Sequence, residues 1–206
     1  MKPGRSLENG LIMTEKSPIR SVTETVKLER SFFTRDVLEV APDLLCKVLV
    51  IRSEYDSIRR FLISETEAYR GSDDRACHAA RGRTPRTEVM YHEGGRLYVY
   101  FVYGMYWMLN VVTGSENDPQ AVLIRGLENC QGPGRVTRLL GIDRSFYGED
   151  LVSSGRIWIE ESGIKPAYLT GPRIGVDYAG EFWKNKPWRY FCSPANPFTP
   201  NPLKGA

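Results

Sequence analysis

The stretch Leu97–Val112, LYVYFVYGMYWMLNVV, is the most apolar part of the chain. Two runs rich in aromatic and β-branched residues flank Gly104, a pattern typical of two strands joined at a sharp bend. Tyr103 then lies at the tip of a β-hairpin with Met105 beyond it, whereas several other aromatic residues of the run are expected to pack the sheet. A tyrosine at such a tip is poorly placed for a core and well placed to enter another structure.

The flanking sequence predicts further strands and short helices. Expected strands are residues 47–52, 58–69, 121–127 and 156–160. Thr34 is expected to cap a helix over residues 35–40, and Pro42 to begin a second turn that buries Leu44 and Leu45. Gly132-Pro133-Gly134 is expected to open a helix that runs to Leu140 and stops at Gly141. Residues 71–86, rich in Gly, Arg and Asp, predict a long loop, and long loops are usually functional.

Length and composition indicate one globular domain. The 206 residues are 41% hydrophobic and 26% charged, and no run of 18 apolar residues predicts a membrane span. Residues 1–27 are expected to form a flexible arm, residues 28–192 the domain, and residues 193–206 a proline-rich tail. The four cysteines, scattered along the chain, favour reduced thiols in the cytoplasm over a disulfide framework or a zinc site.

The charge distribution is compatible with nucleic acid without requiring it. The net charge is +3 and the isoelectric point is near 8.6. Arginines gather in two places: Arg81, Arg83 and Arg86, and then Arg135, Arg138 and Arg144. A solvated basic surface explains these clusters equally well.

Two carboxylates mark the end of the strand over residues 58–69. Alternation places Glu65, Glu67 and Tyr69 on one face, with neighbours ~6.6 Å apart, and the same face is expected to carry Phe61 and Ile63. A strand end that simply reaches water is one explanation. Glutamate is disfavoured in strands, however, so two at i and i+2 also suggest a site.

His78 lies in the long loop, where it can be functional or merely exposed. The chain has only two histidines and no HxxxH, HxH or CxxC spacing. The sequence therefore gives no support for a metal site.

Taken together, these segments resemble the alkyladenine (3-methyladenine) DNA glycosylases. The resemblance covers residues 35–191 and rests on ETEAY (65–69), Asp74 with Ala76-Cys77-His78, Thr84-Pro85-Arg86 with Met90, YVYFVYGMY (98–106), Asn110, VLIR (122–125), Gly132-Pro133-Gly134, RIGV (173–176) and Ala179-Gly180-Glu181. Thr87 replaces an asparagine that is usual in the family, and residues 1–27 have no counterpart.

The resemblance implies a mixed α+β (α/β) single domain with a curved, largely antiparallel sheet and a protruding hairpin that inserts into DNA. It implies that Glu67 is the general base, and that Asn110 and Arg125 support the pocket and the water site. Tyr69, His78 and Tyr100 correspond to the pocket for a flipped base, and Tyr103 with Met105 to the intercalating tip. Contacts of Arg83, Arg86 and Gly134 with the DNA backbone are expected from the basic loop and the helix start.

The implied activity is a monofunctional, cofactor-free and metal-free glycosylase of base excision repair. It would flip alkylated or deaminated purines (3-methyladenine, 7-methylguanine, hypoxanthine or ethenoadenine) out of duplex DNA and hydrolyse the N-glycosidic bond. We expect a monomer in the bacterial cytoplasm, with damaged double-stranded DNA as its partner and no membrane association. The alternatives are a non-catalytic damage-binding protein and a small-molecule or formyl-transfer enzyme on a related scaffold.

Overall fold

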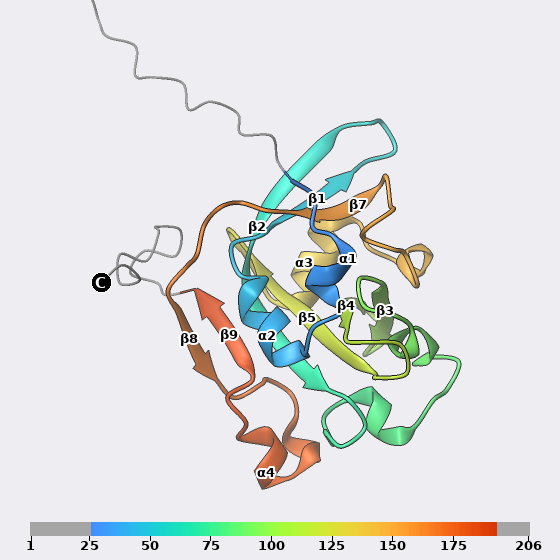
Figure 1. Ribbon diagram of the computed structural model, residues 1–206, viewed down its shortest axis with the longest axis vertical. Helices are drawn as coiled ribbons and strands as arrows, with labels where there is room; N and C mark the ends of the chain where they lie inside the picture. Colours follow the sequence, from blue (N-terminus) through green and yellow to red (C-terminus); the bar gives the residue numbers. More distant parts are fainter. Residues whose placement is uncertain (1–25, 193–206) are drawn as a thin grey trace, which may run out of the picture.

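The computed structural model describes residues 26–192, which form a large antiparallel sheet with few helices (Figure 1). The strands are β1 (Val48–Arg52), β2 (Ile58–Arg70), β3 (Leu97–Val102), β4 (Tyr106–Thr113), β5 (Gln120–Leu127), β6 (Cys130–Gln131), β7 (Ile157–Glu160), β8 (Tyr168–Gly171) and β9 (Arg189–Cys192). The α-helices are α1 (Arg30–Phe33), α2 (Val37–Asp43), α3 (Pro133–Leu140) and α4 (Glu181–Lys184). Short 3-10 helices are η1 (His78–Arg81), η2 (Glu88–Tyr91), η3 (Arg144–Phe146) and η4 (Asp177–Ala179). The expected mixed α+β domain is confirmed.

The long strand β2 is the spine of the sheet. The hydrogen-bonded order is β3-β4-β5-β2-β1-β7, with β6 added to β5, β9 to β2 and β8 to β9. The first part of β2 pairs with β1, and its second part lies between β5 and β9. Glu67 therefore sits where three strands meet.

A register irregularity in β2 and β5 decides which way the carboxylates point. Glu65 lies opposite Gly126, and the pairing shifts on both sides of that position, as at a β-bulge. Alternation is broken as a result: Ile63 and Ala68 both pack in the main core, although their odd spacing would place them on opposite faces. The expectation that Phe61 and Ile63 share a face with the two carboxylates is therefore wrong.

Helix α2 packs on the core face of the sheet, in front of it in Figure 1. Its N-cap is Asp36, whose carboxylate accepts the Leu38 N–H at 2.8 Å, so the expected Thr34 cap is wrong. Pro42 lies inside the last turn of α2 and does not start a second one. The predicted burial of Leu44 and Leu45 is confirmed.

The elements that were predicted best are those whose bends and ends are determined by local turn residues. β3 and β4 pair up to Val102 and Tyr106, so the hairpin bend at Gly104 is confirmed. Gly104 has φ 67°, a left-handed conformation that suits glycine. Helix α3 ends at Gly141, whose φ of 71° closes the helix as expected.

The expected domain limits can be compared only in part. Of the expected arm, Val26 and Lys27 are described, and both pair with the chain at the end of β7. The remainder of the arm and the proline-rich tail lie outside the described residues. Within residues 26–192, no helix is long and apolar enough to span a membrane.

Candidate active site

Alternate residues of four neighbouring strands form a floor on the sheet face opposite α2. Leu109, Val111, Val122 and Ile124 face the core, so their neighbours in β4 and β5 point the other way. The floor residues are Tyr98 and Tyr100 (β3), Met108 and Asn110 (β4), Leu123 and Arg125 (β5) and Tyr69 (β2).

This floor lines a cavity of about 330 Å³, a size that suits a small ligand. Of the predicted site residues, the cavity is lined by Tyr69, His78, Arg86, Tyr100, Tyr103, Asn110 and Arg125. Met105, Arg83 and Gly134 lie outside this lining. Glu67 lies directly behind the wall, in contact with Tyr69 and Ile174, both of which line the cavity.

The Glu67 carboxylate is fully buried, accepts two hydrogen bonds and forms an ion pair with Arg125. The Tyr69 hydroxyl donates to Oε2 at 2.9 Å, and the Ile174 N–H donates to Oε1 at 2.9 Å. Arg125 Nε lies 3.6 Å from Oε1. Burial raises the pKa of Glu67, while Arg125, the Ile174 N–H and the Tyr69 hydroxyl oppose that rise. The result is a positioned carboxylate that is more basic than usual.

Glu65 is tied into ion pairs and does not contact the cavity. Its Oε1 accepts Arg125 Nε at 3.1 Å and Arg189 Nη1 at 3.0 Å. The two carboxylates therefore share Arg125, and β9 supplies a second cation for Glu65 alone. Glu65 therefore has a structural role in this ion-pair network.

His78 enters the cavity from the start of η1. Its Nδ1 lies 2.8 Å from the Tyr98 hydroxyl, and its ring meets that of Tyr100 edge-on with 4.6 Å between centroids. Burial, assisted by Arg86 and Arg81, lowers the pKa of His78 to about 4, so the imidazole is neutral at pH 7. A neutral ring offers one N–H donor and one acceptor nitrogen.

Asn110 is fixed to the neighbouring strand. Its Nδ2 donates to the Tyr98 carbonyl at 3.0 Å, and the residue is buried. The amide therefore holds one orientation at the cavity floor between the tyrosines of β3 and Arg125.

A buried ion pair that the sequence did not assign holds the other wall. Both Arg173 and Asp74 have fully buried side chains; Arg173 Nη2 donates to Asp74 Oδ1 at 2.9 Å, and Nη1 donates to the Ala68 carbonyl. This clamp fixes the chain so that the next N–H, that of Ile174, reaches Glu67. Asp74 and Arg173 both belong to the segments that carry the resemblance. The only sign of the pair in the sequence is that these segments contain an acidic and a basic residue to which no role was assigned.

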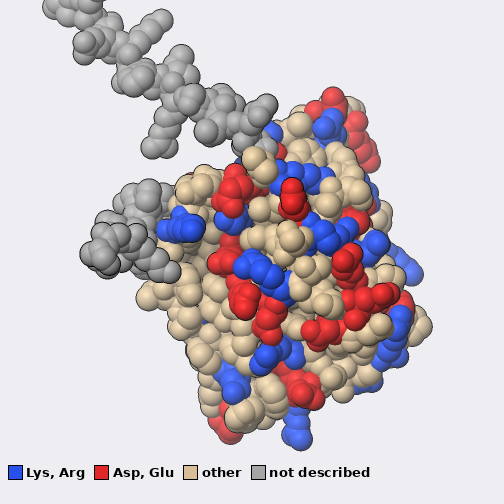
Figure 2. Space-filling view, viewed as in Figure 1, with Lys and Arg blue, Asp and Glu red and all other residues tan. Residues whose placement is uncertain are grey.

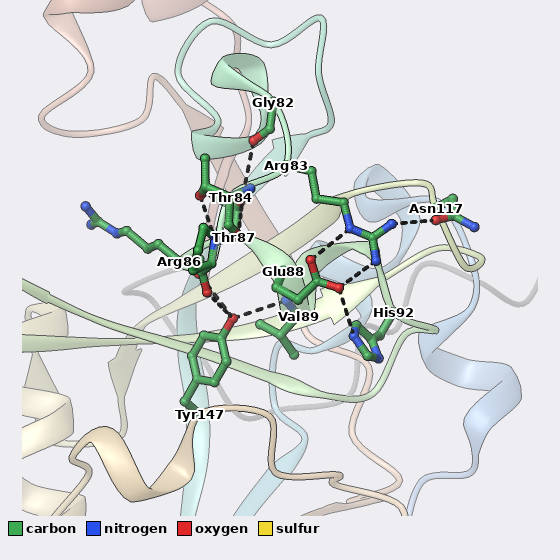
Figure 3. Close-up of polar contacts among 11 residues, drawn as sticks. Gly82, Arg83, Thr84, Arg86, Thr87, Glu88, Val89, His92, Asn117 and Tyr147 are labelled. Carbon is green, nitrogen blue, oxygen red and sulfur yellow. Dashed lines mark hydrogen bonds and ion pairs between the residues drawn. The ribbon is translucent and has the colours of Figure 1, made fainter.

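The loop that carries Arg83 and Arg86 is held in place by hydrogen bonds to threonine side chains and to Tyr147 (Figure 3). The Tyr147 hydroxyl lies within 3.3 Å of the Pro85 and Arg86 carbonyls and accepts the Val89 N–H. The Thr87 hydroxyl accepts the Thr84 N–H at 2.9 Å and closes the turn. The family's usual asparagine is thus replaced by a residue that still caps this turn.

The two arginines of this loop differ in what they face. Arg86 places its guanidinium 4.9 Å from the centre of the Tyr100 ring, at the cavity. Arg83 instead binds both oxygens of Glu88, and its Nη1 also donates to Asn117 (Figure 3). A phosphate contact of Arg83 stays a prediction, and such a contact would compete with Glu88.

The hairpin tip is exposed beside the cavity. Tyr103 is 80% exposed and Met105 60% exposed. Tyr103 has φ 54°, which is unfavourable for a side chain of its size, and the turn is closed by the Met105 N–H on the Val102 carbonyl. An aromatic ring is therefore held outside the core at the cost of local strain.

Gly134 lets helix α3 approach the hairpin closely. A Cβ at this position would lie 2.6 Å from Tyr106 Cδ1, which only a shift of the ring or backbone could relieve. The Thr137 hydroxyl donates to the Trp107 carbonyl and fixes the same contact. The expected phosphate contact of Gly134 stays a prediction.

The opposite face of the molecule has a different character. Figure 2 shows the face that carries α1 and α2, where basic and acidic side chains are intermixed. Arg30 of α1 pairs with Asp150, and Asp36 at the start of α2 pairs with Arg70. Within residues 26–192, no group of three or more His, Cys, Asp or Glu side chains could hold a metal ion.

Comparison with known proteins agrees with this arrangement. The sequence matches the family described as "Methylpurine-DNA glycosylase (MPG)" over residues 31–131 and 128–196. Several proteins that are provisionally named 3-methyladenine DNA glycosylases are similar to this chain. The protein from Psychrobacter cryohalolentis is 42% identical, with 73% of this chain and 85% of the relative covered. That from Desulfitobacterium hafniense is 42% identical (80% and 94%), and that from Wolbachia pipientis subsp. Culex pipiens is 46% identical (77% and 88%). The chain belongs to the methylpurine-DNA glycosylase family, whose substrate is DNA.

Proposed function

We propose that this protein is a monofunctional DNA glycosylase that hydrolyses the N-glycosidic bond of damaged purines and leaves an abasic site. The proposed substrates are 3-methyladenine, 7-methylguanine, hypoxanthine and ethenoadenine. One observation carries the proposal: a buried carboxylate, Glu67, which accepts two hydrogen bonds and pairs with Arg125, lies against an aromatic cavity whose rim bears an exposed tyrosine. The names of the relatives point to 3-methyladenine first.

Glu67 supplies the base for the hydrolytic step. It takes a proton from water as the water oxygen bonds to the sugar C1′, and the electron pair of the broken bond leaves with the purine. A positioned base contributes about 10²–10⁴-fold. Its pKa, raised by burial, favours proton uptake, and Arg125 balances the charge.

The cavity selects the base. Alkylation at N3 or N7 makes a purine cationic, and the rings of Tyr69 and Tyr100 each add roughly 0.5–2 kcal/mol of cation–π attraction. Neutral His78 can donate to or accept from the base edge. Undamaged purines gain no cation–π term.

The exposed hairpin tip supports extrusion of the base from a duplex. Unstacking a base costs a few kcal/mol, and Tyr103 filling the gap would offset part of that cost.

We propose that the protein acts as a monomer in the bacterial cytoplasm.

The alternatives are less consistent with the site. A protein that only binds damage has no need of a buried carboxylate held by two hydrogen bonds and an arginine, and a small-molecule enzyme has no need of a strained, exposed tyrosine. Among the residues lining the cavity there is no lysine to form a Schiff base, which favours simple hydrolysis over strand cleavage.

The test uses duplex oligonucleotides that each contain one of the four lesions, treated with alkali after incubation to reveal abasic sites. We expect the protein to produce alkali-dependent breaks, and Glu67→Gln to produce them about 10²–10⁴-fold more slowly while still binding lesion DNA. Strand breaks before alkali treatment would overturn the monofunctional assignment. Failure to release any of the four bases would overturn the proposed activity.

A further inference from the structure

Two cysteines that are 146 residues apart in sequence meet at the edge of the core. The Sγ atoms of Cys46 and Cys192 are 3.7 Å apart, and no disulfide joins them in the structure. Cys46 lies between α2 and β1, and Cys192 is the last residue of β9, a strand that packs beside α2 (Figure 1). We propose that this pair is an oxidation site that forms a reversible disulfide between the start of β1 and the end of β9.

The backbone at Cys46 supports a role for its sulfur. Five non-glycine residues in the described part of the chain have positive φ: Cys46, Asp56, Tyr103, Asn117 and Asn129. Asp and Asn tolerate this conformation, and Tyr103 is the exposed hairpin tip. Cys46, with φ 62°, is buried instead, and its N–H is bonded to the Ile63 carbonyl. A position that suits glycine is therefore filled by the residue that meets Cys192.

The two sulfur atoms need only a short movement to reach the length of a disulfide bond. Forming an S–S bond of about 2.05 Å requires the sulfurs to approach by about 1.7 Å. Cys77 belongs to a separate buried cluster, where burial raises its pKa to about 12 and makes its thiol unreactive. Cys130 lies at the β5–β6 turn and is the competing candidate for the test.

The two thiols have different reactivities. The hydrogen bond shared with Cys46 lowers the pKa of Cys192, while that bond and burial raise the pKa of Cys46. Cys192 is also the more exposed of the two. Cys192 is therefore the first to attack.

The reaction balances with a small disulfide such as oxidised glutathione as oxidant. The Cys192 thiolate attacks one sulfur of the oxidant, forms a mixed disulfide and releases one glutathione thiolate. Cys46 loses its proton to solvent as its sulfur attacks Cys192 Sγ, and a second glutathione thiolate leaves. The protein loses two electrons and two protons, and the oxidant becomes two thiols.

The bond would fasten the segment that completes the cavity. Between β8 and β9 the chain supplies Arg173 and Ile174 to one wall, and β9 itself supplies Arg189 to Glu65. Cys192 ends that segment. A disulfide between Cys192 and Cys46 suppresses local opening of the β8–β9 segment without contacting a residue that lines the cavity.

The first experiment is peptide mapping after equilibration with oxidised glutathione. We expect two of the four thiols to disappear and one cross-linked peptide pair containing Cys46 and Cys192. Cys192→Ser should keep its three remaining cysteines free of intramolecular cross-links, whereas Cys130→Ser should form the same cross-link as the parent. Four remaining thiols, or a cross-link to Cys130, would overturn the proposal.

The second experiment tests whether the disulfide stabilises the β8–β9 segment or forms without any effect on it. Closing a loop of this length predicts a rise in Tm of about 10 °C on oxidation, reversed by dithiothreitol and absent in Cys192→Ser. Amide hydrogen exchange of residues 168–192 should slow in the oxidised protein, while exchange in β3 and β4 stays unchanged. An oxidised protein with unchanged Tm and unchanged exchange would refute the proposed fastening of this segment. Neither readout requires DNA, so the result is independent of the proposed glycosylase activity.

Discussion

Replacing Tyr69 by Phe removes one of the two hydrogen bonds to Glu67 and keeps the aromatic wall. The Tyr69 hydroxyl remains protonated at any working pH, because burial, reinforced by Glu67, raises its pKa well above 10.0. It is therefore a permanent donor to the carboxylate, at 2.9 Å. The ring of Phe would fill the same place in the cavity.

The size of the effect follows from the hydrogen bond. A hydrogen bond to a charged group contributes about 1.5–3 kcal/mol. The Tyr69 bond stabilises the ionised form of Glu67 by an amount of this order, so its loss raises the pKa of Glu67 further. Because Glu67 must be ionised to accept a proton, the activity rises with pH through that pKa. The acid limb of the profile should therefore move to higher pH, and the plateau above it should change little.

The assay is single-turnover base excision measured across the acid limb. Tyr100→Phe is the matched control, since it removes a hydroxyl from the same cavity and leaves the Tyr69–Glu67 bond in place. We expect a shift in Tyr69→Phe alone. An acid limb at the parental position, or equal shifts in both variants, would refute the view that this hydroxyl tunes Glu67.

The other predictions concern the remaining parts of the site. Glu67→Gln should lose about 10²–10⁴-fold in excision with lesion binding retained, whereas Glu65→Gln should keep measurable turnover; single-turnover rates and binding titrations compare them. Tyr103→Ala should destabilise the flipped state by a few kcal/mol, with a large loss of excision on paired lesions and a small one on mismatched or single-stranded substrates; equal loss on all of them would make the tyrosine structural. Arg83→Ala should reduce the slope of log K against log[salt] by up to about one unit, and Glu88→Gln, which removes the competitor for Arg83, should steepen it by up to about one unit. Dialysis against EDTA should leave excision intact, and activity that zinc or magnesium restores after such dialysis would contradict a metal-free site.

Features set by neighbouring residues were predictable from the sequence. The hairpin at Gly104 and the helix from Pro133 to Gly141 depend on glycine and proline at fixed local positions, and both were found where expected. The helix cap was misplaced by two residues because Thr34 and Asp36 are both good caps. The sequence does not show that Gln120 also accepts the Val37 N–H and so fixes the start of α2.

Features that depend on distant contacts were not predictable. The Arg173–Asp74 clamp and the Cys46–Cys192 pair join residues 99 and 146 positions apart. No local period signals either of them. The position of Glu67 behind the cavity wall has the same origin, because the N–H that holds it comes from Ile174, across the fold.

The register irregularity at Glu65 and Gly126 ties together the lengths of two segments that are far apart in the chain. Removing one residue from β2 there would put every later pair, from Thr66 opposite Ile124 onward, one position out of step. Gly126 is also closely packed against the opposite strand, since a Cβ on it would lie 3.0 Å from the Cβ of Glu65. A matching removal from β5 would restore the pairing. Insertions and deletions in these two strands should therefore be tolerated only as coordinated pairs, a constraint that no single-codon change can satisfy.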